Sequence, residues 1–223
     1  MKLIVIGAGQ SAYDENVLDV ISDAKKRNDT EKLKDLQIIS TDRILKYVLE
    51  HDIIPEYTCI QENLYPHLRF GKKDYLKEFF DHDIVRKYAK QIKIYYSQQL
   101  RWYRTKLLKE MGFEMTLFNR HGCGGNLKPV IVTCGHCSMA CVEIGRYILK
   151  ADMIAVIGMD MDLTKSWKLY EKTTIADNML QNTIRRTATS FVDTGKPLYN
   201  LTRKGRFQCR GVEESNIDEF LKM

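Results

Sequence analysis

Gly7, Gly9 and Ser11 follow directly after the first apolar run of the sequence, in the segment KLIVIGAGQSAYD. A glycine-rich turn between a strand and a helix lets a ligand approach the backbone, and the N–H groups that begin the helix attract phosphate or carboxylate groups. Ala12 is a small residue in the third position of the dinucleotide fingerprint G-x-G-x-x-G/A. We therefore expect this turn, Gln10 included, to bind a nucleotide. The alternative is a tight strand–helix connection that binds no ligand.

A second turn of the same kind lies in the segment VIVTCGHCSMAC. An expected strand at Val130–Thr133 is broken by Gly135, and Ser138 can cap the helix that follows. In open α/β sheets, ligands bind beyond the carboxyl ends of the strands, where the strand order reverses. We therefore predict that Gly135, Cys137 and Ser138 contact the same nucleotide.

Acidic residues follow two other expected strands. Asp42 comes after the second strand, where the dinucleotide fingerprint has the residue that binds the ribose. The strand Met153–Ile157 is followed by Gly158, Asp160 and Asp162. A carboxylate at the end of a strand can hold Mg²⁺ or a ribose hydroxyl. We predict Asp42 and Gly158 as nucleotide contacts and Asp160 and Asp162 as metal ligands, and the alternative for the last two is an acidic cap on the next turn.

Six cysteines are present, and three of them lie close together in CGHCSMAC, at Cys134, Cys137 and Cys141. A C-x-x-C pair can bind zinc or cycle between thiol and disulfide, although a structural zinc site normally has a second pair. Small core residues are the third interpretation. Cys59 and Cys209 stand alone in the sequence and are expected to be isolated buried thiols.

Short β-branched runs alternate with longer amphipathic stretches, which is typical of a parallel sheet with helical crossovers. Strands are expected at Leu3–Ile6, Gln37–Ser40, Tyr57–Ile60, Ile92–Tyr96, Glu114–Phe118, Val130–Thr133, Met153–Ile157 and Pro197–Asn200. Helices are expected at Glu15–Lys26, Arg43–His51, Tyr75–Phe80, Gln98–Met111, Ser138–Lys150 and Ile175–Thr194, and at the end after a cap at Ser215 or Asn216. The fold class is therefore α/β and Rossmann-like, with helices on both faces of the sheet. We expect one domain over residues 1–223, in which residues 71–118 form an inserted basic, aromatic segment or lid.

The net charge of +6 is concentrated in Arg86–Lys109, which contains many basic residues, several aromatic residues and no acidic one. Such a stretch could bind a nucleic acid, or it could be an amphipathic helix with Trp102 and Tyr103 packed inward. An exposed aromatic surface there could also join copies of the chain into a homo-oligomer. No apolar run approaches about 18 residues, and the start of the chain does not read as a secretory signal, so we expect a soluble, cytoplasmic protein.

Three blocks, taken in order, resemble the MptE-like family: VIGAGQSAYDENV, IISTDRILKYVLEHDIIPEYTCIQEN and GHCSMACVEIGRYILKADMIAVIGMDM. The ending KPLYNLTRKGRFQCRGVEESNIDEFLK is similar to that family's closing segment, and Gln10 replaces a proline of the family's first loop. The resemblance implies a Rossmann-like nucleotide-binding fold related in shape to bacterial sialyltransferases. The family includes archaeal 6-hydroxymethyl-dihydropterin pyrophosphokinases and proteins implicated in attaching nonulosonic sugars to flagellins.

The resemblance also implies site residues. Those that would lie against the nucleotide, near its phosphate or at the edge of the site are Gly7, Gly9, Ser11, Gly135, His136, Ser138 and Asp160. No histidine follows His136 in this sequence, so a general base would come from His121, His136, Glu62, Asp160 or Asp162. We predict Asp160, His136 and Glu62 as the catalytic residues.

The function expected from these observations is a nucleotide-dependent transferase that moves a sugar from a CMP- or UDP-type donor to a small acceptor. One alternative is a pyrophosphokinase that uses ATP and Mg²⁺ on a pterin-like acceptor. The other is a protein that binds a nucleotide or a nucleic acid without catalysis.

Overall fold

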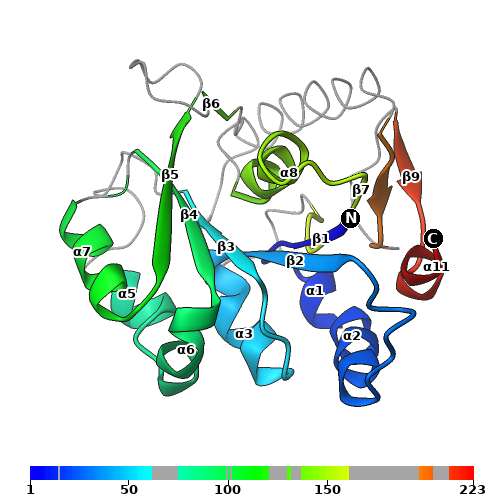
Figure 1. Ribbon diagram of the computed structural model, residues 1–223, viewed down its shortest axis with the longest axis horizontal. Coiled ribbons are helices and arrows are strands. Elements are labelled where there is room, and N and C mark those ends of the chain that lie inside the picture. The colour runs from blue at the N-terminus through cyan, green and yellow to red at the C-terminus, as the bar shows by residue number, and fades with distance from the viewer. Residues whose placement is uncertain are drawn as a thin grey trace.

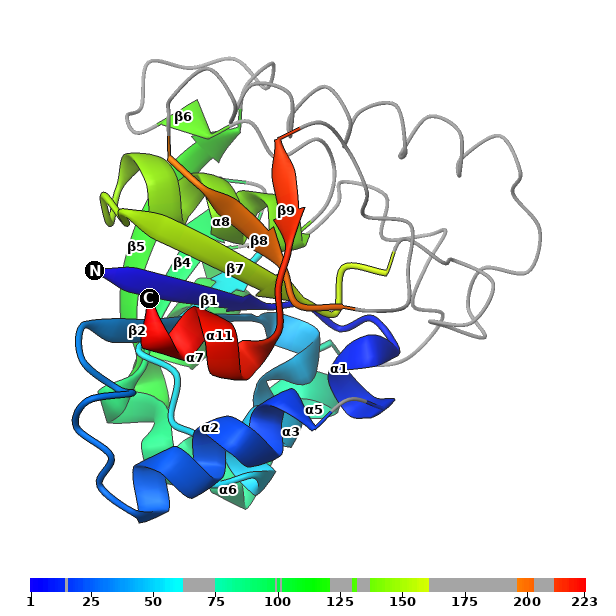
Figure 2. The same cartoon turned by 90° about the vertical axis from the view of Figure 1, so that its right-hand side faces the viewer.

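A parallel sheet is the frame of the molecule in the computed structural model, which describes residues 1–14, 16–61, 75–98, 100, 102–120, 130–131, 137–160, 196–202 and 211–223. Its strands are β1 (Lys2–Ile6), β2 (Leu36–Thr41), β3 (Tyr57–Ile60), β4 (Lys93–Ser97), β5 (Glu114–Arg120), β6 (Val130–Ile131), β7 (Met153–Ile157), β8 (Leu198–Asn200) and β9 (Val212–Glu214). The strand order within the described residues is β6-β5-β4-β3-β2-β1-β7-β8-β9, and every pair of neighbours is parallel. The chain thus starts in the middle of the sheet, proceeds outward to β6 and returns to β7 on the other side of β1, which makes the β1–β7 boundary the point where the strand order reverses (Figure 2).

Helices cover both faces of this sheet (Figure 1). The described α-helices are α1 (Ser11–Asp14), α2 (Val17–Lys26), α3 (Leu45–Glu50), α5 (Tyr75–Phe79), α6 (Asp83–Tyr88), α7 (Trp102–Glu110), α8 (Cys137–Tyr147) and α11 (Ile217–Lys222), with 3₁₀ turns η1 (Asp42–Ile44) and η2 (Ala89–Gln91). Helix α8 lies on one face, and α1, α2 and α3 lie on the other. This arrangement is the α/β, Rossmann-like fold that the alternating pattern predicts.

The two faces of β1 explain the layers. Successive side chains of a strand point to opposite faces, so the buried Leu3 and Val5 belong to the core that includes α8, whereas Ile4 and Ile6 belong to the core that includes α2. A third apolar cluster, built around Phe80, lies beneath the β3–β4 part of the sheet with α3, α6 and α7. Strands that are covered on both faces carry nearly continuous apolar runs, as in the segment KLIVI.

The expected strands are found at β1 to β8, although only residues 130–131 of the expected Val130–Thr133 are described. The expected helix Glu15–Lys26 is found as α2, and the short helix α1 before it was not expected. The expected helix Ile175–Thr194 lies outside the described residues. Helix α6 and strand β9 were not predicted from the sequence, because both are too short to show a clear apolar period. In β9, two of the three residues are also acidic. Within residues 71–118, β4 and β5 are members of the central sheet beside β3.

The aromatic side chains of α7 do not pack inward, so that prediction is wrong. Trp102 is 77% exposed and Tyr103 is 37% exposed, and Leu108 is the residue of α7 that is buried. The basic stretch Arg86–Lys109 is also not one helix, because it is divided among α6, η2, β4 and α7. Trp102 is the first residue of its helix, where the chain has only just left the sheet, and this position faces solvent.

Candidate functional site

Buried polar side chains gather at the carboxyl ends of the strands. Ser11 follows β1, Asp42 follows β2 and Asp160 follows β7, and none of the three is more than 7% exposed. All strands in the described part of the chain are parallel, so their carboxyl ends meet at the same edge of the sheet. Further buried polar residues at or near strand ends on this edge are Ser97, Asn119, Asn200 and Thr202. Buried polar groups need partners within the chain, and here they concentrate at one edge of the sheet, whereas its two faces are covered by apolar clusters.

The glycine loop after β1 packs directly on the loop after β7. The N–H of Gly7 donates to the Ile157 carbonyl and the N–H of Gly9 donates to the Gly158 carbonyl, each over 2.8 Å. A Cβ on Gly7 would lie 2.4 Å from the Gly158 oxygen, and a Cβ on Gly9 would lie 2.6 Å from the same atom. The two glycines are therefore required by the contact between these loops, whatever else they bind.

Ser11 and Asp160 form the centre of this contact. The Ser11 N–H donates to Asp160 Oδ2 over 2.6 Å, and the Ser11 hydroxyl donates to Asp160 Oδ1. The Ser11 hydroxyl oxygen in turn accepts from the Gly158 N–H and lies 3.1 Å from the Thr202 hydroxyl. A serine hydroxyl has one proton, which is used on Asp160, so Thr202 is the donor in the last pair. The Thr202 N–H donates to Asn200 Oδ1, which joins the end of β8 to the same network.

The Asp160 carboxylate thus lies at the start of α1, where we expected a ligand's phosphate. The N–H groups of Gly7, Gly9 and Ser11 all donate within the chain, and both carboxylate oxygens of Asp160 accept from Ser11. In the structure, these hydrogen bonds hold the loops after β1 and β7 together. Contact of these residues with a nucleotide, and of Asp160 with a metal, stays a prediction. Gln10 is exposed, and its amide donates to Asp14 over 2.7 Å.

The start of α8 lies beside the glycine loop. Ser138 is buried, and its hydroxyl oxygen is 2.6 Å from the position that a Cβ on Gly7 would take. The structure therefore brings Ser138 to the same edge as Ser11 and Asp160, as the two glycine-containing turns in the sequence predict. The other predicted residues, namely Glu62, His121, Gly135, His136 and Asp162, lie outside the described residues.

Asp42 is the acidic residue at the end of β2, as expected. It is 5% exposed and begins the 3₁₀ turn η1, where its Oδ1 accepts from the N–H of Arg43 over 2.9 Å. Its position, one strand away from the glycine loop, is the one in which the dinucleotide fingerprint places the residue that binds a ribose.

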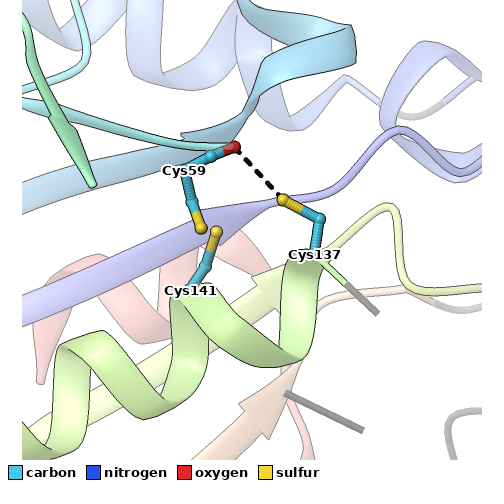
Figure 3. A group of neighbouring side chains, drawn as sticks. All are labelled: Cys59, Cys137 and Cys141. Atoms are coloured by element: carbon cyan, nitrogen blue, oxygen red, sulfur yellow. Dashed lines mark hydrogen bonds between the residues drawn. The ribbon is translucent and has the colours of Figure 1, made fainter. Parts of the chain in front are cut away.

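The prediction that Cys59 is an isolated thiol is wrong. Cys59 of β3 faces Cys137 and Cys141 of α8, and the three sulfur atoms lie within 4.8 Å of one another (Figure 3). The Cys137 thiol donates to the Cys59 carbonyl over 3.1 Å. Burial and hydrogen bonds from the neighbouring thiols raise the pKa of the Cys59 thiol well above its usual range, and burial does the same to the pKa of Cys141. Cys134 lies outside the described residues.

Glu143 is a buried titratable residue that the sequence reasoning missed. It lies on α8 and is 2% exposed. Burial raises the pKa of its carboxyl to about 7, although the Arg146 guanidinium acts in the opposite direction. The available signal was a single acidic residue within the otherwise apolar run MACVEIG.

Comparisons with known proteins bear on the fold of this chain. The sequence matches no protein-family model and no curated protein, so membership of the MptE-like family is not confirmed. Among solved structures, this fold is similar to that of a glycosyltransferase. That structure is the MAf glycosyltransferase from Magnetospirillum magneticum AMB-1, with a TM-score of 0.60 and 9% sequence identity. The match covers 97% of this chain and 34% of the glycosyltransferase, so this chain spans about a third of that protein's length.

No described helix combines the length and the apolar character that a membrane span requires. Binding of nucleic acid by residues 86–109, self-association and cytoplasmic location stay predictions.

Proposed function

We propose that this chain is a transferase domain that moves a sugar from a nucleotide-activated donor of the CMP or UDP type to a small acceptor. The observation that carries this proposal is the gathering of buried acidic and hydroxyl side chains at the carboxyl edge, on both sides of the β1–β7 boundary. Open α/β sheets bind nucleotides at this place. The similarity in fold to a glycosyltransferase supports the same class of reaction.

Each described residue has a distinct part in this proposal. Asp42 accepts hydrogen bonds from the ribose hydroxyls, and Ser138, in the first turn of the eleven-residue helix α8, contacts the phosphate that leaves. Asp160 acts through Ser11 and positions the glycine loop against which the nucleotide lies. Cleavage of the sugar–phosphate bond develops positive charge on the sugar and negative charge on the leaving phosphate, and the start of a helix stabilises the latter. Either Glu62 or His136 is the general base in this proposal.

The first test is a calorimetric titration of the purified protein with CMP, UMP, GDP and ATP, each with and without Mg²⁺. Metal-independent binding of CMP or UMP, together with slow hydrolysis of the matching nucleotide sugar when no acceptor is present, is the expected result. Binding of ATP only with Mg²⁺, with release of AMP, would instead establish pyrophosphate transfer and contradict the proposal. Absence of binding by all four nucleotides would contradict it as well.

The first testable prediction concerns the two ends of β2, which offer a matched pair of variants. Asp42 follows the strand at the carboxyl edge, and the exposed Asp35 precedes it at the opposite edge. We expect Asp42→Asn to weaken nucleotide binding about 10- to 100-fold, because hydrogen bonds to a charged group are worth roughly 1.5–3 kcal/mol. Asp35→Asn has the same change in charge and is expected to bind as the unmodified protein does. Equal affinities of the two variants would exclude Asp42 from the site.

A further inference from the structure

Cys59, Cys137 and Cys141 come from two elements that lie far apart in the sequence. Cys59 is in β3, whereas Cys137 is the first residue of α8 and Cys141 is one helical turn further on. Residues at i and i+4 share one face of a helix, so both thiols of α8 point toward the sheet, and Cys59 faces them from it (Figure 3). This convergence depends on α8 crossing β3 and does not follow from the C-x-x-C spacing.

The separation of the sulfur atoms suits one metal ion. A thiolate binds zinc at about 2.3 Å, so three sulfurs around a single ion lie roughly 4 Å apart. The three sulfurs here are within 4.8 Å of one another, so shifts of less than about 1 Å bring them to that spacing. Such shifts are within the reach of side-chain rotation and need no movement of α8.

The chemistry of the cluster restricts the kind of ion. Three sulfur atoms form a soft ligand set, and such sets select Cu(I) and Zn(II) rather than Mg²⁺ or Ca²⁺, which require oxygen ligands. Cys59 and Cys141 are fully buried, and Cys137 is partly exposed. An ion can therefore reach the cluster from the side of Cys137.

We propose that Cys59, Cys137 and Cys141 bind one soft, thiophilic cation, Cu(I) or Zn(II). Each thiol that coordinates the ion releases its proton to solvent as the metal–sulfur bond forms, and no oxidant or reductant takes part. The bound ion links α8 to β3 and so fastens the helix that begins beside the glycine loop. This inference does not rest on the proposed sugar transfer: Cys59 and Cys141 have no part in it, although Cys137 is also a predicted nucleotide contact.

The test uses a variant that retains only the three clustered thiols, with Cys123, Cys134 and Cys209 changed to serine. The reduced, metal-free variant is incubated anaerobically with Zn(II) or with Cu(I) and is then separated from unbound metal. We expect one ion per chain with one or both metals and protection of the partly exposed Cys137 thiol from alkylation. We also expect a melting temperature that rises by several degrees and falls again when a chelator is added.

Alanine variants distinguish the cluster from other binding positions. Cys59→Ala and Cys141→Ala, made in the same background, are expected to retain no stoichiometric metal. Because a buried substitution can impair folding, alkylation of the unmodified protein, mapped by mass spectrometry with and without metal, gives a second measurement. Failure of the three-thiol variant to bind either metal, or metal protection of cysteines other than these three, would overturn the proposal. Formation of a disulfide between two of them, without metal binding, would overturn it too.

Discussion

At the scale of single residues, the glycines of the loops after β1 and β7 have a structural role besides the predicted ligand binding, because they let the two loops pack together. Gly158 has a φ of +70°, and a Cβ on it would lie 2.2 Å from the carbonyl oxygen of Gly7. Gly7 and Gly9 are in turn confined by the backbone of Gly158. A substitution at any of the three therefore disturbs the contact between the loops before it affects a ligand.

The second prediction follows from this contact. We expect Gly158→Ala to lower the free energy of unfolding by about 3 kcal/mol or more, because about 1–2 kcal/mol of left-handed backbone strain is added to a collision with backbone atoms. Chemical denaturation measures this loss. Lys150 has a φ of +60° but is exposed, so Lys150→Gly measures the effect of left-handed backbone strain without a collision. We expect it to change the free energy of unfolding by no more than about 1 kcal/mol. Changes of equal size in the two variants would mean that the collision is absent.

The third prediction concerns Glu143, whose carboxyl has its pKa raised to about 7 by burial. The folded state holds this proton more tightly than the unfolded state does, so the contribution to stability is fully present below the ordinary pKa of about 4.5. It is lost as the pH rises through about 7. The loss is on the order of 2–3 kcal/mol between pH 5 and pH 8.

Glu143→Gln removes this titration, so its unfolding free energy should decline less between pH 5 and pH 8 than that of the unmodified protein. Denaturation at several pH values is the measurement, and Glu50→Gln, on the surface of α3, is the control. If both variants retain the original pH dependence, Glu143 is not the group that titrates.

At the scale of elements, helix ends are held in two different ways. Helix α1 has only four residues, which is too short to be stable alone, and its first N–H is bound by Asp160 from the loop after β7. Helix α11 has a local cap, because the Asn216 side chain accepts from the N–H of Glu219 over 2.9 Å. The sequence left Ser215 and Asn216 as equal candidates, and the structure identifies Asn216.

The fourth prediction is that Asn216→Ala lowers the free energy of unfolding by about 1 kcal/mol, which is the usual value of such a cap. Phe220 and Leu221 of α11 are buried against the sheet, so loss of the cap is transmitted to the core. Ser215→Ala is the matched control, because the Ser215 hydroxyl donates only to the neighbouring Asn216 carbonyl over 3.3 Å. Thermal unfolding of both variants is the measurement. A larger loss of stability in Ser215→Ala than in Asn216→Ala would mean that Asn216 is not the cap.

At the scale of the whole molecule, β1 is the interior strand at which the strand order reverses. It pairs with β2 on one side and with β7 on the other along all five of its residues, and four of those residues are fully buried. The C-terminal helix closes on the same strand, because the Lys2 ammonium donates to the Leu221 carbonyl over 2.7 Å. Among the described strands β9 is the outermost on the β7 side of the sheet, and two of its three residues are exposed.

The fifth prediction is that amide hydrogens of Leu3–Ile6 exchange only through global unfolding, whereas those of Val212–Glu214 exchange faster by local opening. Hydrogen exchange followed by mass spectrometry or NMR measures the difference, and β2 provides an internal reference with neighbours on both sides. Equal protection of β1 and β9 would contradict the central position of β1.

Much of the fold follows from the sequence, because the period of the apolar residues is a local property. Runs such as KLIVI and MIAVI contain the strand signal within five residues, and their alternation with amphipathic segments is enough to predict a parallel sheet. The glycine turns after β1 and β7 were also recognisable, since a strand that ends in glycine marks the edge at which ligands bind. Short elements such as β9 were not, because their pairing partners, rather than their own composition, make them strands.

The sequence by itself therefore determined the class of fold, the edge of the sheet that carries the polar residues, and the residue types that gather there. Only the tertiary structure decided which of these residues touch. It placed Asp160 on Ser11, so that a carboxylate of the chain lies where a phosphate was expected, and it brought Cys59 to Cys137 and Cys141. The reason is physical: these contacts join residues that are between 78 and 149 positions apart, and such pairs meet only when strand order and helix placement are established.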